Sequence, residues 1–227
     1  MTVTAVRKDA ETLTMTLDAE FDASPERVWQ LWADPRQLER WWGPPTYPAT
    51  VTSHDLRPGG RIEYHMTGPD GDQPRGYWEI IEADAPRSLV FQDGFANADG
   101  TPNSDLPLAE AHVTIVEIGD GRTRMSIQHI FPDAAAMEQV IAMGMEEGLT
   151  QAVGQIDAIL AGTPPHGPDP ATPPPLRQAQ RTGQQTHYPS AAGMVRNSAP
   201  AARPSGVQLV TAPSGPPVRR VALVPTR

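Results

Sequence analysis

Two histidines, His112 and His129, lie in neighbouring segments, 110–118 and 122–130, whose apolar residues alternate as in a β-hairpin. Imidazole nitrogens that face each other can hold a metal ion. If the hairpin turns on only Asp120 and Gly121, His112 lies directly opposite His129. That register would offer two metal ligands.

The alternative register needs a three-residue turn, Gly119-Asp120-Gly121, with Gly121 left-handed. It shifts the pairing by one residue, so that Val113 faces Ile127. A shift of one residue moves every side chain to the other face, and only this register pairs apolar with apolar residues, so we predict it. The histidine pair then disappears. No HExxH or similar spacing occurs elsewhere and the chain has no Cys, so we expect no metal site, no thiol catalysis and no cofactor.

Asp93 and His129 are the candidates for acid–base chemistry. In the chosen register, alternation places both on the face of the sheet that meets the last helix. A carboxylate and an imidazole in one apolar cavity can exchange protons with a ligand. Such groups are more often hydrogen-bonded at a cavity rim, so we rank them as weak catalytic candidates. Tyr64 could give a ligand a hydrogen bond by the same geometry, and there is no GxSxG motif or phosphate-binding loop.

The elements that position these residues begin with a strand over 11–21, where apolar and polar residues alternate. Ser24 is a suitable N-cap, with Pro25 at the first helical position and Glu26 in the first turn, which predicts a short helix. Asp34-Pro35 ends that helix and begins a second one, which contains the Trp41-Trp42 pair.

Further along, six strands are expected, over 49–54, 60–67, 76–83, 88–95, 110–118 and 122–130. A long helix is expected over 133–161, between Pro132 and Gly162. This helix is the only element long enough to cover one face of the sheet. The predicted fold class is therefore α+β: a curved seven-stranded antiparallel sheet wrapped on a long C-terminal helix, with two short helices.

A cavity between the sheet and the last helix is indicated by that helix itself. Its apolar stripe mixes methionines with glycine, and Gly148 within a helix costs about 1 kcal/mol relative to Ala, which calls for a reason. Small residues there either leave space opposite the sheet or allow its strands to approach closely. The residues expected to bind a ligand are Trp42, Tyr64, Met66, Trp78, Phe91, Phe95, Met125, His129, Met137, Ile141, Met145 and Gly148.

Composition divides the chain at residue 162. All five Trp and all four Phe precede that point, so only 1–162 can bury a large core, and 163–227 is expected to be a disordered tail. The first part carries 11 basic and 26 acidic residues, a net charge of −15, and the tail carries +6. An acidic domain repels phosphate backbones, so nucleic-acid binding is not expected. No signal peptide or membrane-spanning run is visible, and the expected location is the cytoplasm.

Four segments carry a resemblance to a known family: FDASPERVWQLWADPRQLERWWGP, LRPGGRIEYHMTGPDG, RGYWEIIEADAPRSLVF and MGMEEGLTQAVGQIDAIL. Together, and in this order, they resemble the START-like (SRPBCC) superfamily, in the branch named after the activator of heat-shock-protein-90 ATPase. The resemblance covers roughly residues 10–161. It departs at Met145, because many members of the branch carry Trp after the helix glycine.

The resemblance implies a helix-grip domain that binds a small hydrophobic or aromatic molecule, such as a lipid or an aromatic natural product. The superfamily also contains enzymes, so a cyclase or hydrolase that uses Asp93 and His129 is an alternative. The second alternative is a co-chaperone-like activator of a heat-shock ATPase, which would need a docking surface for a chaperone. A second copy of the chain is a further candidate partner.

Overall fold

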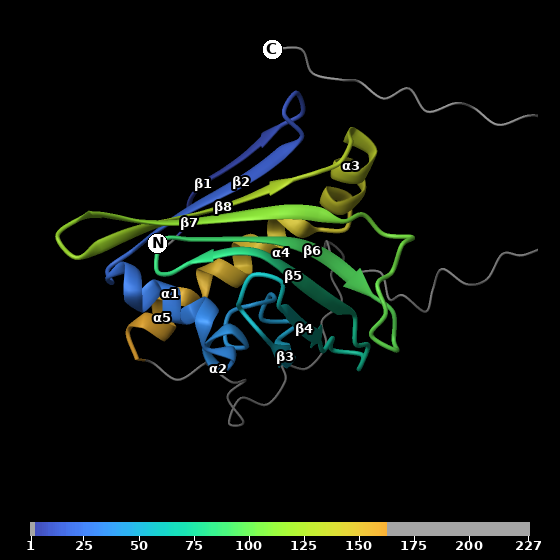
Figure 1. The fold of residues 1–227 in the computed structure, drawn as a ribbon, viewed down its shortest axis with the longest axis horizontal. Helices are drawn as coiled ribbons and strands as arrows, with labels where there is room; N and C mark the ends of the chain where they lie inside the picture. Colours follow the sequence, from blue (N-terminus) through green and yellow to red (C-terminus); the bar gives the residue numbers. More distant parts are fainter. Residues whose placement is uncertain (1–2, 163–227) are drawn as a thin grey trace, which may run out of the picture. The chain divides into compact units, whose positions relative to one another are not determined.

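A strongly twisted antiparallel sheet forms one layer of the protein, and the helices α4 and α5 lie against one face of it (Figure 1). The computed structural model describes residues 3–162, and the predicted tail lies outside the described residues. The strand order is β1-β2-β8-β7-β6-β5-β4-β3, and every neighbouring pair is antiparallel. The predicted α+β helix-grip class is confirmed. The strands are β1 (Val3–Asp9), β2 (Thr14–Phe21), β3 (Ala49–His54), β4 (Arg61–Met66), β5 (Arg75–Asp84), β6 (Ser88–Ala96), β7 (Ala109–Gly119) and β8 (Arg122–Ile130).

The sheet has eight strands, one more than the seven predicted. The additional strand, β1, forms a hairpin with β2, and the Asp9 carboxylate closes the turn by accepting hydrogen bonds from the backbone N–H groups of Glu11 and Thr12. These bonds hold the pKa of Asp9 below its usual range. An edge strand of this kind is half-buried or exposed along its whole length. It therefore lacks the strict apolar alternation by which a strand is recognised.

The two short helices begin where their caps predict. In α1 (Pro25–Ala33) the Ser24 hydroxyl accepts from the backbone N–H of Arg27 at 3.4 Å. In α2 (Pro35–Leu38) the Asp34 carboxylate accepts from the N–H of Arg36 at 2.9 Å. The second helix is shorter than predicted and ends before the tryptophan pair, which lies in the turns that follow.

The predicted long C-terminal helix is wrong in its continuity. The structure has α3 (Ala134–Ala142), α4 (Met145–Gly154) and α5 (Ile156–Leu160) instead. Gly144 separates α3 from α4 with a φ of 91°, in the left-handed region that glycine tolerates best. Its N–H donates back to the carbonyl of Ile141, and its own carbonyl accepts from Gly148, so one residue ends one helix and begins the next. Figure 1 shows α3 apart from α4 and α5, at the end of β8.

Replacing Gly144 with Ala should lower the free energy of unfolding by about 1–2 kcal/mol, because a left-handed backbone is strained for a residue with a Cβ atom. Gly154→Ala is the matched control. Gly154 lies within α4, and an added Cβ meets no atom within 4 Å. That variant should be neutral or up to about 1 kcal/mol more stable. Urea unfolding measures both, and an unchanged stability of Gly144→Ala would contradict this account of the helix break.

The β7–β8 hairpin has the predicted register, with Val113 opposite Ile127, although the turn differs from the prediction. The turn consists of the two residues Asp120 and Gly121, both at positive φ. A bulge between Glu117 and Gly119 then shifts the pairing by one residue. His112 lies opposite Gln128, so the two histidines do not face each other.

Candidate functional site

A cavity of about 110 Å³ lies among strands β4, β5, β6, β7 and β8, the helices α3 and α4, and the segment that follows α2. Its walls are mostly apolar, with Asp93 and His129 among them. Its lining consists of Trp42, Gly43, Pro44, Tyr64, Met66, Pro74, Arg75, Gly76, Asp93, Gly94, Phe95, Pro107, Ala109, His129, Val140, Met143, Met145, Gly148, Leu149 and Ala152.

Seven of the twelve residues predicted to bind a ligand belong to this lining, and the two acid–base candidates belong to it as well. Their contribution to binding stays a prediction. The seven are Trp42, Tyr64, Met66, Phe95, His129, Met145 and Gly148.

Three further predicted residues lie in the core behind the cavity instead. The rings of Trp78 and Phe91 pack against each other with centroids 4.4 Å apart, and both side chains are fully buried. The sulfur of Met125 accepts a hydrogen bond from the indole N–H of Trp32 at 3.4 Å. Alternation identified the correct face of the sheet for Phe91 and Met125, and Trp78 was assigned to the same face although its strand is apolar on both faces. The pattern could not show how deep each residue lies.

Met137 and Ile141 are also outside the lining, for a different reason. The prediction followed one continuous helical stripe, whereas the left-handed Gly144 reorients α3 relative to α4. As a result Val140 and Met143, which are one and two residues away from that stripe, line the cavity instead. The sequence feature that could have indicated lining residues on both sides of the break is the pair Met143 and Met145, which flank Gly144.

Glycines in β5 and β6 shape the cavity wall, and the sequence analysis did not identify them. The Tyr64 ring lies over Gly76 so closely that a Cβ atom there would be 2.4 Å from the ring. On the next strand a Cβ atom at Gly94 would be 2.6 Å from the ring of Tyr77. Burial raises the pKa of Tyr77, and the Arg61 guanidinium stacks on its ring at 4.1 Å. On the cavity side the Tyr64 ring thus takes the place of a Cβ atom at Gly76, whereas Tyr77 covers Gly94 on the opposite face of the sheet.

Trp42 is held in the wall by contacts on both sides. Its ring meets Trp78 edge-on at 4.7 Å between centroids and Tyr64 at 6.0 Å. Behind it, the Gln155 carboxamide donates to the backbone carbonyls of Trp41 at 3.2 Å and Gly43 at 2.8 Å. Gln155 lies between α4 and α5, so these bonds fasten the tryptophan segment to the helices. The indole N–H of Trp42 is inaccessible to solvent and has no hydrogen-bonding partner within residues 3–162.

Asp93 and His129 come together across the middle strand β7. Asp93 pairs with Ala109, and His129 pairs with Ala111, so the two side chains approach each other diagonally over two alanines. The distance from His129 Nε2 to Asp93 Oδ2 is 3.4 Å. The contact is not aligned as a hydrogen bond, and both imidazole nitrogens lack a hydrogen-bonding partner among the described residues. His129 is fully buried, whereas the Asp93 side chain is 18% exposed.

Within residues 3–162, no group of three or more His, Asp or Glu side chains is placed to hold a metal ion. None of the helices in this part of the chain has the length and hydrophobicity that a membrane crossing requires.

A family model described as "Activator of Hsp90 ATPase homolog 1-like protein" matches residues 22–161, which is more than half of the chain. The chain belongs to this family. The branch lies within the START-like superfamily, as the sequence motifs indicated. The family fixes the scaffold, and one scaffold of this kind supports different functions.

Solved structures agree with the family assignment. Protein Ms6760 from Mycobacterium smegmatis is 53% identical, with a TM-score of 0.66, and the match covers 71% of this chain and 98% of that chain. A protein from Arthrobacter aurescens, solved by solution NMR, is 45% identical, with a TM-score of 0.70 and coverage of 75% and 99%. No curated protein matches the chain.

Proposed function

We propose that the domain binds one small, mainly apolar molecule in the cavity between the sheet and α4. The observation that carries this proposal is the composition of the wall: apolar side chains surround a space that the partly exposed Asp93 carboxylate also lines. Ligand sites in proteins commonly combine apolar walls with a few polar groups that orient the ligand.

The size of the cavity narrows the ligand class. A water-sized group needs about 10–15 Å³ of such space, so a cavity of about 110 Å³ holds roughly seven to eleven non-hydrogen atoms. A single substituted ring fits within that space, whereas a long acyl chain would have to extend beyond it. Among the expected ligands, aromatic molecules are therefore favoured over lipids.

A thermal-shift panel tests the proposal with the full chain. A ligand at a hundred times its dissociation constant stabilises the folded state by about 2.7 kcal/mol. For a domain of this size, the melting temperature should rise by about 5–10 °C. Single-ring aromatic compounds should produce this shift selectively, and linear acyl compounds should not. A flat panel on a protein that unfolds cooperatively would contradict the binding function.

The contact between Asp93 and His129 favours an enzyme as the second candidate function. A carboxylate and an imidazole at 3.4 Å, in the wall of one cavity, could transfer a proton to or from a bound ligand. Each compound from the panel is incubated with the protein and analysed for products by mass spectrometry. His129→Gln should then reduce turnover by about 100-fold or more while the dissociation constant changes little. Absence of any product would overturn this alternative.

The family description also refers to activation of an Hsp90 ATPase. A chaperone activator needs an exposed docking surface, whereas the feature on which the proposal rests is a concave, mostly apolar cavity. Ligand binding is therefore preferred, and a chaperone pull-down becomes the next experiment only if the panel is flat.

A further inference from the structure

We propose that the cavity selects a small aromatic ligand whose polar end is a cation, a protonated amine, which pairs with the Asp93 carboxylate. This inference rests on the proposed binding function and names the ligand chemistry that the same site would recognise.

The first support is that the Asp93 carboxylate lines the cavity without a hydrogen-bond donor from the described residues. Its side chain is 18% exposed and belongs to the cavity lining. Among the described residues no side chain or backbone group donates a hydrogen bond to it, and no Lys or Arg pairs with it. The ionisable side chain in contact with it is His129, at 3.4 Å and without hydrogen-bond alignment. A carboxylate that faces an apolar cavity in this way is stabilised by a donor that carries positive charge.

The second support is the remainder of the lining, which offers no competing cation on the cavity side. Arg75 contributes to the lining, but it precedes Gly76 on β5 and pairs with His65 and Ala96. Alternation along the strand directs its side chain to the outer face, because Gly76 lies under Tyr64 on the inner face. Asp93 is thus the acidic residue that the lining places on the inner face, next to the imidazole of His129.

The third support is aromatic. Trp42, Tyr64 and Phe95 all belong to the lining, and aromatic faces attract cations by about 0.5–2 kcal/mol, most strongly where water is excluded. The field of the whole domain acts in the same direction. Residues 1–162 carry 26 acidic and 11 basic side chains, so the surface concentrates cations and repels anions.

The test uses three probes of nearly equal size that differ in the polar end: benzylamine, benzyl alcohol and benzoate. Each is titrated into the full chain by calorimetry at pH 7. A charge-assisted hydrogen bond contributes about 1.5–3 kcal/mol, so benzylamine should bind at least about tenfold more tightly than benzyl alcohol. Benzoate should show no binding. Equal or tighter binding of either benzyl alcohol or benzoate would overturn the inference and leave the binding function intact.

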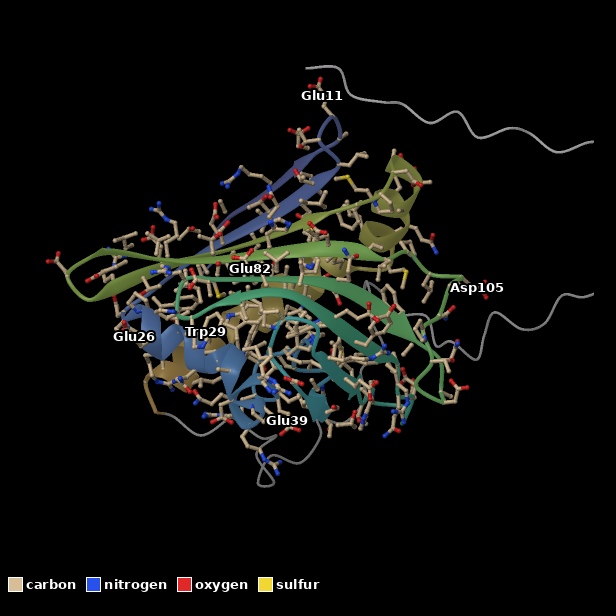
Figure 2. All side chains as sticks on the ribbon, in the orientation of Figure 1. Glu11, Glu26, Trp29, Glu39, Glu82 and Asp105 are labelled. Atoms are coloured by element: carbon tan, nitrogen blue, oxygen red, sulfur yellow. The ribbon has the colours of Figure 1, made fainter. Side chains whose placement is uncertain are left out.

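Asp93→Asn removes the charge and keeps the shape of the side chain. The dissociation constant of benzylamine should rise at least about tenfold, while that of benzyl alcohol stays within about threefold. Asp105→Asn is the matched control, since Asp105 is an exposed carboxylate in the loop between β6 and β7 and lies outside the lining (Figure 2). It changes the net charge equally and should leave all three affinities unchanged.

Three results of the variants and probes would contradict the inference in different ways. Unchanged benzylamine affinity in a folded Asp93→Asn variant would show that the carboxylate does not select the ligand. If none of the three probes binds while the thermal-shift panel identifies another aromatic ligand, the amine preference fails and the binding function survives. If neither the probes nor the panel shows binding, both proposals fail together.

Discussion

Trp32→Ala should lower the free energy of unfolding by about 3–5 kcal/mol. Trp32 is fully buried on α1, and its ring lies 4.8 Å from Trp41 and 5.7 Å from Trp78 between centroids. Its indole N–H also donates to the sulfur of Met125 in β8. The substitution therefore removes a large ring from the place where the first helix, the turn after α2 and the sheet meet, and it leaves a space that the surrounding rings cannot close.

Urea unfolding of the full chain, followed by far-UV circular dichroism, measures this effect. The loss is a large share of the total, because domains of this size are stable by only about 5–15 kcal/mol. Trp32→Phe keeps an aromatic ring and should cost less than the alanine variant. A loss below about 1 kcal/mol for Trp32→Ala would show that this cluster does not hold the helices to the sheet.

Ala152→Phe should abolish binding of the small ligands without unfolding the domain. Ala152 lies on α4, is 2% exposed and belongs to the cavity lining. The six added ring carbons would occupy about 60–90 Å³, which is most of a cavity of about 110 Å³. Because the ring takes the place of the ligand, the ligand-dependent rise in melting temperature should disappear.

Ala158→Phe is the matched control, since Ala158 is exposed on α5 and the substitution has the same effect on helix propensity. It should keep the full ligand-dependent shift. Overpacking can cost about 1–3 kcal/mol, so Ala152→Leu, with three added carbons, serves as a milder second variant and should weaken binding. A folded Ala152→Phe protein that retains the whole shift would place the ligand outside this cavity.

The sequence predicted the sheet well wherever one face of a strand is buried. Strand β8 has the expected bounds, and the register that pairs Val113 with Ile127 followed from apolar matching alone. The same argument placed Asp93 and His129 on the cavity side. Burial of one face makes register a strong constraint, because a shift of one residue would expose every core side chain.

The features that the sequence did not reveal depend on single backbone conformations, on low burial, or on how the sheet and helices pack. Gly144 has a helical neighbourhood on both sides, and nothing local distinguishes a tolerated glycine from a left-handed break. The bulge near Gly119 replaced the three-residue turn and gave the same register by another route. Edge strand β1 has little burial, so it left no periodic signal. The depth of Trp78 and Phe91 in the core depends on how the sheet and helices pack.

The most direct test of cavity binding is the two-dimensional NMR spectrum of the indole N–H groups during titration with a compound that gives a thermal shift. Trp42 lines the cavity, whereas Trp29 lies on α1 outside the lining, so each reports on a different place (Figure 2). We expect the Trp42 resonance, assigned with Trp42→Phe, to move in proportion to occupancy while the Trp29 resonance stays in place. A titration that moves Trp29 and leaves Trp42 unchanged would contradict it.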